Sequence, residues 1–137
     1  MFVLRVKAHF LPWHTGKCKT PHGHRWEVEV TIEARSLNED GIIVDFGVIK
    51  ELLPDHKFLN EAEYLRRLTL DFPDYADELE HVARQVGDWI KNPTAERIAD
   101  RLYDRVMHLL EAGGVDYQSL SVRVWESPGC SVERVNR

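Results

Sequence analysis

The feature that most constrains the fold is an unbroken alternation of residue types over residues 22–32. Side chains two apart on a β-strand point to the same face, so this pattern predicts a strand that is buried on one side. Charged and polar residues, from Arg25 to Glu33, occupy the exposed face. The face predicted to be buried holds His22, His24, Trp26, Val28, Val30 and Ile32. The two histidines therefore lie at the end of the buried face.

Two further segments also alternate and predict strands. Residues 2–10 direct Phe2, Leu4, Val6, Ala8 and Phe10 to one face, and the closing strand does the same with Leu120, Val122, Val124 and Glu126. The stretch from Pro12 to Pro21 connects the first two strands, so we expect an antiparallel pair joined by a long functional loop.

Two helices are predicted between the second and third strands. Asp45 is a suitable cap for a helix over Phe46, Ile49 and Leu53, which Pro54 ends or interrupts. A second helix is predicted to begin at Asn92-Pro93, to carry Ile98, Leu102, Val106 and Leu109, and to stop at Ala112-Gly113-Gly114. Residues 61–91 form an inserted helical segment. The sequence thus predicts a single α+β domain, residues 1–137, with an antiparallel sheet.

Composition excludes several classes of function. A formal charge of −5 argues against a nucleic-acid-binding surface. Because no apolar run reaches the length of a membrane span and the first residues include charges, we expect neither a signal peptide nor contact with a membrane. The expected location is the cytoplasm, where Cys18 and Cys130 would remain free thiols.

The histidines predict a metal site. His22 and His24 share a strand face and can bind one ion, and His9 is the candidate third ligand. Imidazole suits zinc, and three imidazoles with an open position are typical of catalytic zinc. In a regular strand, however, His9 shares a face with Lys7 and Arg5, so it reaches the ion only through a bulge or a turn at the strand end. His14 is the reserve ligand.

Cys18 and the adjacent pair Asp55-His56 are candidates for proton transfer. Lys17 and Lys19 flank Cys18, and their positive charge lowers the pKa of a thiol, which favours a base or nucleophile. The alternatives for Cys18 are a fourth zinc ligand or an inert thiol. Asp55-His56 offers an imidazole and a carboxylate that orients it, although such a dipeptide is also common in solvated turns.

Glu126 is a candidate ligand-binding residue. It continues the apolar face of the closing strand, where an unpaired carboxylate is costly, so a ligand edge with two adjacent N–H groups would suit it. The alternative is that the strand ends by Trp125 and that Glu126 lies in solvent.

Six segments, in this order, resemble the family of 6-pyruvoyltetrahydropterin synthase and 6-carboxytetrahydropterin synthase, zinc enzymes of the tunnelling fold. They are Ala8-His9, Cys18-x-x-x-His22-Gly23-His24, residues 41–46, 55–60 and 92–96, and Trp125-Glu126. Within that family, the short spacing between Cys18 and His22 is similar to the queuosine-pathway branch. The implied substrate is 7,8-dihydroneopterin triphosphate. The implied products are 6-carboxy-5,6,7,8-tetrahydropterin, acetaldehyde and triphosphate.

The resemblance also implies roles for individual residues. His9, His22 and His24 would hold zinc, Cys18 would remove a substrate proton as a thiolate, and Asp55 with His56 would complete the proton relay. Glu126 would anchor the 2-amino and ring N–H edge of the pterin, with Thr94 nearby. Members of the family join their sheets into a barrel with sites between subunits, so a homohexamer is implied.

Three departures from the family pattern concern substrate choice. Pro54 precedes Asp55, the insertion at residues 61–91 is longer than usual, and Arg5 and Lys7 replace apolar or small residues. Glu80-His81 is a remote alternative to Asp55-His56.

Two other functions stay open: the pyruvoyl-forming reaction, and a non-catalytic zinc-stabilised binding module in which Cys18 completes four ligands.

Overall fold

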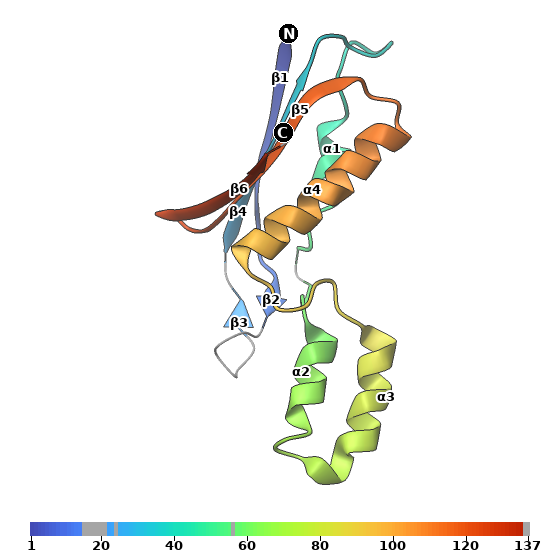
Figure 1. Ribbon diagram of the computed structural model, residues 1–137, viewed down its shortest axis with the longest axis vertical. Helices are drawn as coiled ribbons and strands as arrows, with labels where there is room; N and C mark the ends of the chain where they lie inside the picture. Colours follow the sequence, from blue (N-terminus) through green and yellow to red (C-terminus); the bar gives the residue numbers. More distant parts are fainter. Residues whose placement is uncertain (15–21, 24, 56, 136–137) are drawn as a thin grey trace.

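The computed structural model describes residues 1–14, 22–23, 25–55 and 57–135, with backbone alone at 22–23. Four strands form one sheet in the order β1-β4-β5-β6, and every neighbouring pair is antiparallel (Figure 1). β1 spans Phe2–Phe10, β4 Trp26–Ala34, β5 Tyr117–Ser127 and β6 Cys130–Val135. The predicted α+β class with an antiparallel sheet is therefore confirmed.

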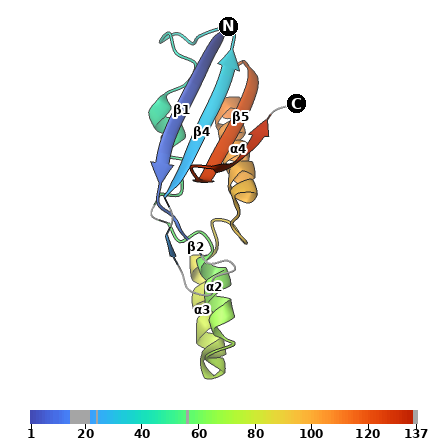
Figure 2. The ribbon, with the colours of Figure 1, turned by 90° about the vertical axis from the view of Figure 1, so that its left-hand side faces the viewer.

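Helices cover one face of the sheet. The long helix α4, Ala95–Ala112, packs against β5 and β6, and the short helix α1, Phe46–Lys50, contacts β1 (Figures 1 and 2). The inward residues of the strands and the apolar face of α4 form one buried cluster, as the two sequence periodicities predict. We call the four strands with α4 the sheet body.

A pair of helices extends beyond one end of the sheet body (Figure 2). Helix α2 spans Glu61–Leu68, a 3₁₀ turn covers Pro73–Tyr75, and α3 spans Ala76–Val86. We call α2 and α3 the helical hairpin; it lies within the segment predicted as a helical insertion. Backbone bonds from Ala62 N–H to Gly87 O (3.2 Å) and from Ile90 N–H to Leu59 O (3.0 Å) hold its base.

The predicted strand over residues 22–32 is wrong at its beginning. β4 starts at Trp26, and the separate short strand β3, His22–Gly23, pairs instead with β2, Trp13–His14. The register places His14 opposite His22. The sequence pattern runs on without a break because β3 of the two-stranded sheet lies shortly before β4 of the four-stranded sheet. The connection between β1 and β4 therefore contains the short strands β2 and β3.

Three other boundaries differ from the predictions. Helix α4 starts at Ala95, because Thr94 is extended (φ −115°, ψ 166°) and caps the helix by accepting the Arg97 N–H. Helix α1 ends at Lys50 and does not reach Leu53, although Asp45 caps it as predicted through a 2.7 Å bond from Gly47 N–H to Oδ1. Strand β6 was not predicted at all. None of the helices in the described chain has the length and apolar character required to cross a bilayer.

Candidate functional site

A row of three side chains crosses the sheet near one end. The strand register pairs His9 of β1 with Glu27 of β4, and Glu27 with Trp125 of β5. These residues lie on the face opposite α4. Together with Lys7, Arg25, Ser127 and Pro128 they line a hollow of about 660 Å³. A volume of this order is within the range of small-molecule sites.

Charges in this hollow are paired around Glu27. Its carboxylate lies 3.4 Å from His9 Nε2 through Oε1 and 3.5 Å from Lys7 Nζ through Oε2. Trp125 contributes a ring between two cations, with Lys7 Nζ 5.2 Å and the Arg123 guanidinium 4.8 Å from its centroid. The hollow therefore offers an imidazole, a carboxylate and an aromatic surface that cations hold in place.

The ladder of β1 and β4 is regular through His9, so the bulge that would turn this side chain inward is absent. His9 accordingly lies on the polar face, as the strand period predicts, with its side chain about 43% exposed. His14, the reserve ligand, lies on β2 with 7% exposure, and its ring meets Trp26 edge-on at 6.0 Å. The two candidate ligands thus occupy different environments at the same end of the sheet.

The segment that contains Asp55 is held against the end of β1. Asp55 Oδ1 accepts the Leu11 N–H at 2.8 Å. Trp13 donates its N–H to Lys57 O at 2.8 Å, and its carbonyl accepts the Leu59 N–H at 2.7 Å. This pairing brings a candidate proton-transfer residue from 44 positions away to the end of the sheet that carries His9.

Glu126 lies near the end of strand β5, and Thr94 lies at the start of helix α4. β5 does not end at Trp125 but continues to Ser127, and Glu126 lies exposed at an irregularity in the pairing with β6. Thr94 is the cap of α4, where its Oγ1 accepts the Arg97 N–H at 3.2 Å. A carboxylate at a strand end and a threonine at a helix start are both open to further hydrogen bonds.

Cys18, His24 and His56 lie outside the described residues, as does the side chain of His22. Among the side chains that the structure describes, no three of His, Cys, Asp and Glu gather at one point to hold a metal. The donor chemistry nevertheless fits zinc, since the candidates are imidazoles and a carboxylate faces Nε2 of His9. Metal-bound histidines commonly carry such a carboxylate on the nitrogen that does not bind the metal.

Lys7, Glu27 and Trp125 were not predicted as members of a shared hollow. The alternating pattern of each strand does assign these residues to the outward face of the sheet. Only the register between β1, β4 and β5 reveals that these outward residues are neighbours.

Comparison of the sequence with known families finds one match. The sequence profile of the 6-pyruvoyl tetrahydropterin synthase family matches residues 6–136. A Rickettsia bellii protein named 6-carboxy-5,6,7,8-tetrahydropterin synthase is 33% identical over 129 residues, which cover 92% of this chain and 91% of that protein. The Bacillus subtilis protein of the same name is 30% identical over 125 residues, covering 88% of this chain and 73% of that protein.

Solved structures share the fold. A crystal structure of an uncharacterized protein from Wolinella succinogenes aligns with a TM-score of 0.66 at 18% identity, covering 99% of this chain and 98% of that one. The Caenorhabditis elegans 6-pyruvoyl tetrahydropterin synthase aligns with a TM-score of 0.54 at 14% identity, covering 99% and 96%. At these identities the likeness concerns the fold.

Proposed function

The chain belongs to the 6-pyruvoyl tetrahydropterin synthase family, and on that basis we propose that it is the zinc-dependent lyase of queuosine biosynthesis that forms 6-carboxy-5,6,7,8-tetrahydropterin. Its substrates would be 7,8-dihydroneopterin triphosphate and one water molecule, with acetaldehyde and triphosphate released. The observation that carries the proposal is the level of identity, 30% or more over about nine-tenths of the chain, to proteins named for this product. We place the enzyme in the cytoplasm.

His9, His22 and His24 would hold the zinc ion, which as a Lewis acid polarises oxygens of the substrate side chain and acidifies the neighbouring carbon. Cys18 takes the proton from that carbon as a thiolate, which Lys17 and Lys19 favour by their charge. Asp55 and His56 return protons to the side chain as it is cleaved. The bonds of Leu11 with Asp55 and of Trp13 with Lys57 and Leu59 support this assignment, because they hold Asp55 and residues 57–59 beside the end of β1.

Glu126 anchors the pterin in this proposal. A carboxylate accepts two parallel N–H bonds from a guanidine-like ring edge, and the exposed position of Glu126 leaves both oxygens accessible to a ligand. Thr94 accepts a backbone bond within α4 and can still donate its hydroxyl proton to the ligand.

We further propose a homohexamer with sites between subunits. Strands β1 and β6 are the two edges of the described sheet. Exposed strand edges favour pairing with another chain, which would join the sheets of neighbouring subunits into a barrel.

The test is product analysis by mass spectrometry. Zinc-loaded protein is expected to consume 7,8-dihydroneopterin triphosphate and release acetaldehyde. Conversion without acetaldehyde would assign the pyruvoyl-forming reaction instead. Unchanged substrate, in an assay where a known relative is active, would contradict both reactions.

Cys18→Ala separates catalysis from metal binding. Loss of a catalytic base predicts about a 10²- to 10⁴-fold fall in turnover, with zinc content and melting temperature unchanged. Cys130→Ala is the matched control, because it removes the exposed thiol at the start of β6 and should keep full activity. Loss of zinc and of the folded state in Cys18→Ala would support a structural zinc module.

A further inference from the structure

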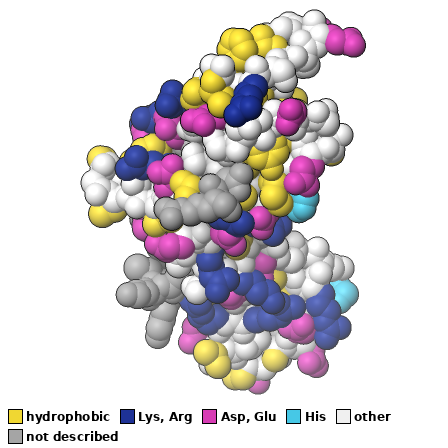
Figure 3. Space-filling view, turned by 45° about the horizontal axis from the view of Figure 1, so that its top comes forward, with side chains coloured by type: hydrophobic (Ala, Val, Ile, Leu, Met, Phe, Trp, Pro, Cys, Tyr) yellow, Lys and Arg dark blue, Asp and Glu magenta, His cyan; other side chains and the backbone are white. Residues whose placement is uncertain are grey.

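A second hollow lies at the base of the helical hairpin, on the side of the sheet that carries α4. It encloses about 490 Å³, and its charged lining consists of four cations and one carboxylate: Arg66, Arg84, Lys91, Arg101 and Asp88. The chain as a whole has a formal charge of −5, so this excess of positive charge is local. Figure 3 shows Lys and Arg side chains gathered in a band across the lower part of the molecule.

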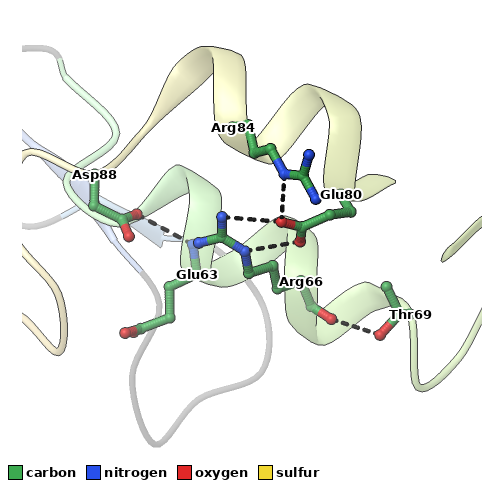
Figure 4. A network of polar contacts seen from close by, with 6 residues as sticks. All are labelled: Glu63, Arg66, Thr69, Glu80, Arg84 and Asp88. Carbon is green, nitrogen blue, oxygen red and sulfur yellow. Dashed lines mark hydrogen bonds and ion pairs between the residues drawn. The ribbon is translucent and has the colours of Figure 1, made fainter. Parts of the chain in front are cut away.

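Two of the four cations are already partly neutralised. Arg66 donates to both oxygens of Glu80, from Nε at 2.9 Å and from Nη2 at 3.3 Å, and Arg84 Nε lies 3.1 Å from the same carboxylate (Figure 4). Asp88 Oδ1 accepts the Glu63 N–H at 3.1 Å. These bonds fix the wall of the hollow and leave the terminal nitrogens of Arg84 for another partner.

Lys91 and Arg101 have no carboxylate within ion-pair distance in the part of the chain that the structure describes. Arg101 is nevertheless held in place, because its guanidinium stacks on the ring of Trp89 with 5.0 Å to the centroid. A guanidinium fixed by an aromatic ring loses less conformational freedom when it binds an anion.

Arg101 also lines two adjoining hollows. One, of about 420 Å³, adds Lys57 together with the carboxylate of Glu61. The other, of about 410 Å³, adds Arg97 and Arg105, which lie four residues to either side of Arg101 on α4, and also the carboxylates of Asp100 and Asp104.

From this arrangement we propose that the hollow around Arg101 and Lys91 is a binding site for an oligophosphate chain. Guanidinium groups match phosphate oxygens in pairs, and a lysine adds a point charge. Several cations around one concave surface favour a compact ligand with several negative charges over a single carboxylate. His9 lies on the opposite face of the sheet, and none of the residues that line this hollow has a role in the proposed pterin site, so the proposal concerns a separate site.

The experiment is isothermal titration of the full-length protein with inorganic triphosphate at low ionic strength. We expect a saturable binding component that is at least tenfold weaker in Arg101→Ala and in Lys91→Ala, and weaker at higher salt. Arg5→Ala is the matched control, since it removes the same charge from the exposed face of β1 and should leave affinity unchanged. Absence of saturable binding, or equal losses in Arg5→Ala and Arg101→Ala, would overturn the proposal.

Two further measurements identify the recognised part of the ligand and test the phosphate site independently of the proposed pterin reaction. ATP is expected to bind as triphosphate does, because the phosphate chain is the recognised part; binding of ATP alone would contradict this. Arg101→Ala is expected to turn over the pterin at the wild-type rate, and Cys18→Ala to bind triphosphate normally. A loss of turnover in Arg101→Ala would place the hollow within the pterin site and refute its independence.

Discussion

Helix α4 buries seven residues against the sheet, whereas α2 and α3 of the helical hairpin bury one residue each, Ala62 and Ala83. The hairpin instead carries the ion pairs of Glu80 with Arg66 and Arg84. Apolar burial contributes a few kcal/mol for each large side chain, whereas exposed ion pairs contribute a fraction of one. The sheet body therefore supplies most of the free energy of folding, and the hairpin is the region that opens at the lower cost.

The largest effect is expected from Leu102→Ala in the sheet body. Leu102 is 1% exposed within the apolar cluster, so removing its side chain should lower the free energy of unfolding by about 2–5 kcal/mol. Urea denaturation measures the loss. The hairpin control is Val82→Ala, whose side chain is 41% exposed and should cost less than about 0.5 kcal/mol. Equal losses would refute the difference between the two regions.

The same difference explains what could be predicted from the sequence. β1, β4, β5 and α4 each bury one face, and burial of one face is what produces a periodic pattern. Strand β6 has no buried residue, so its sequence lacks that pattern, and it was not predicted. The sequence predicted that α4 begins at Asn92-Pro93, whereas Thr94 caps it, because Thr94 is extended and its Oγ1 accepts the Arg97 N–H.

The candidate site could be predicted as a set of residue types but not as an arrangement. The bond between Asp55 and Leu11 joins residues 44 positions apart, and no local pattern encodes it. The row from His9 through Glu27 to Trp125 depends on strand register, which is fixed by pairing across the whole sheet. The roles of Cys18, Asp55, His56, Thr94 and Glu126 remain predictions that the activity assays test.

The second effect in size concerns the junction between the two regions. Asp55→Ala removes the acceptor of the Leu11 N–H and should lower the free energy of unfolding by about 1 kcal/mol. Asp55→Asn retains an oxygen that accepts this bond but loses the charge, so it should recover most of the stability without recovering turnover. Thermal denaturation and the acetaldehyde assay separate the two roles. If Asn recovered turnover as well, the carboxylate would not be part of the proton relay.

A smaller effect is expected from Arg134 of β6, a polar contact within the sheet body. Its guanidinium lies 4.1 Å from the ring centroid of Tyr103 and pairs with Asp100 and Asp104, which ties the edge strand to α4. Arg134→Ala should cost about 0.5–1 kcal/mol, because the site is partly exposed. Denaturation in urea measures this cost. Arg134→Lys keeps the charge but not the planar stacking and should recover only part of it; complete recovery would show that stacking contributes nothing.

The smallest effect concerns the hairpin and its dependence on pH. Hydrogen bonds from Arg66 and Arg84 lower the pKa of Glu80 below its ordinary value of 4.5. Because the folded-state pKa is depressed, the stabilisation is fully present above the ordinary value and is lost as pH falls through the folded-state pKa. Amide hydrogen exchange in α2 and α3 should therefore accelerate below about pH 4.5, relative to the sheet body.

Glu80→Gln should remove this pH dependence, and added salt should weaken it in the wild-type protein because the groups are exposed. Glu78→Gln is the matched control on the same helix, since Glu78 takes part in no ion pair among the described residues. Its exchange profile should follow the wild type. If Glu80→Gln and the wild type lost protection over the same pH range, the ion pairs of Glu80 would not stabilise the hairpin. Apolar packing would then hold the hairpin as it holds the sheet body, and the two regions would differ only in how much apolar surface they bury.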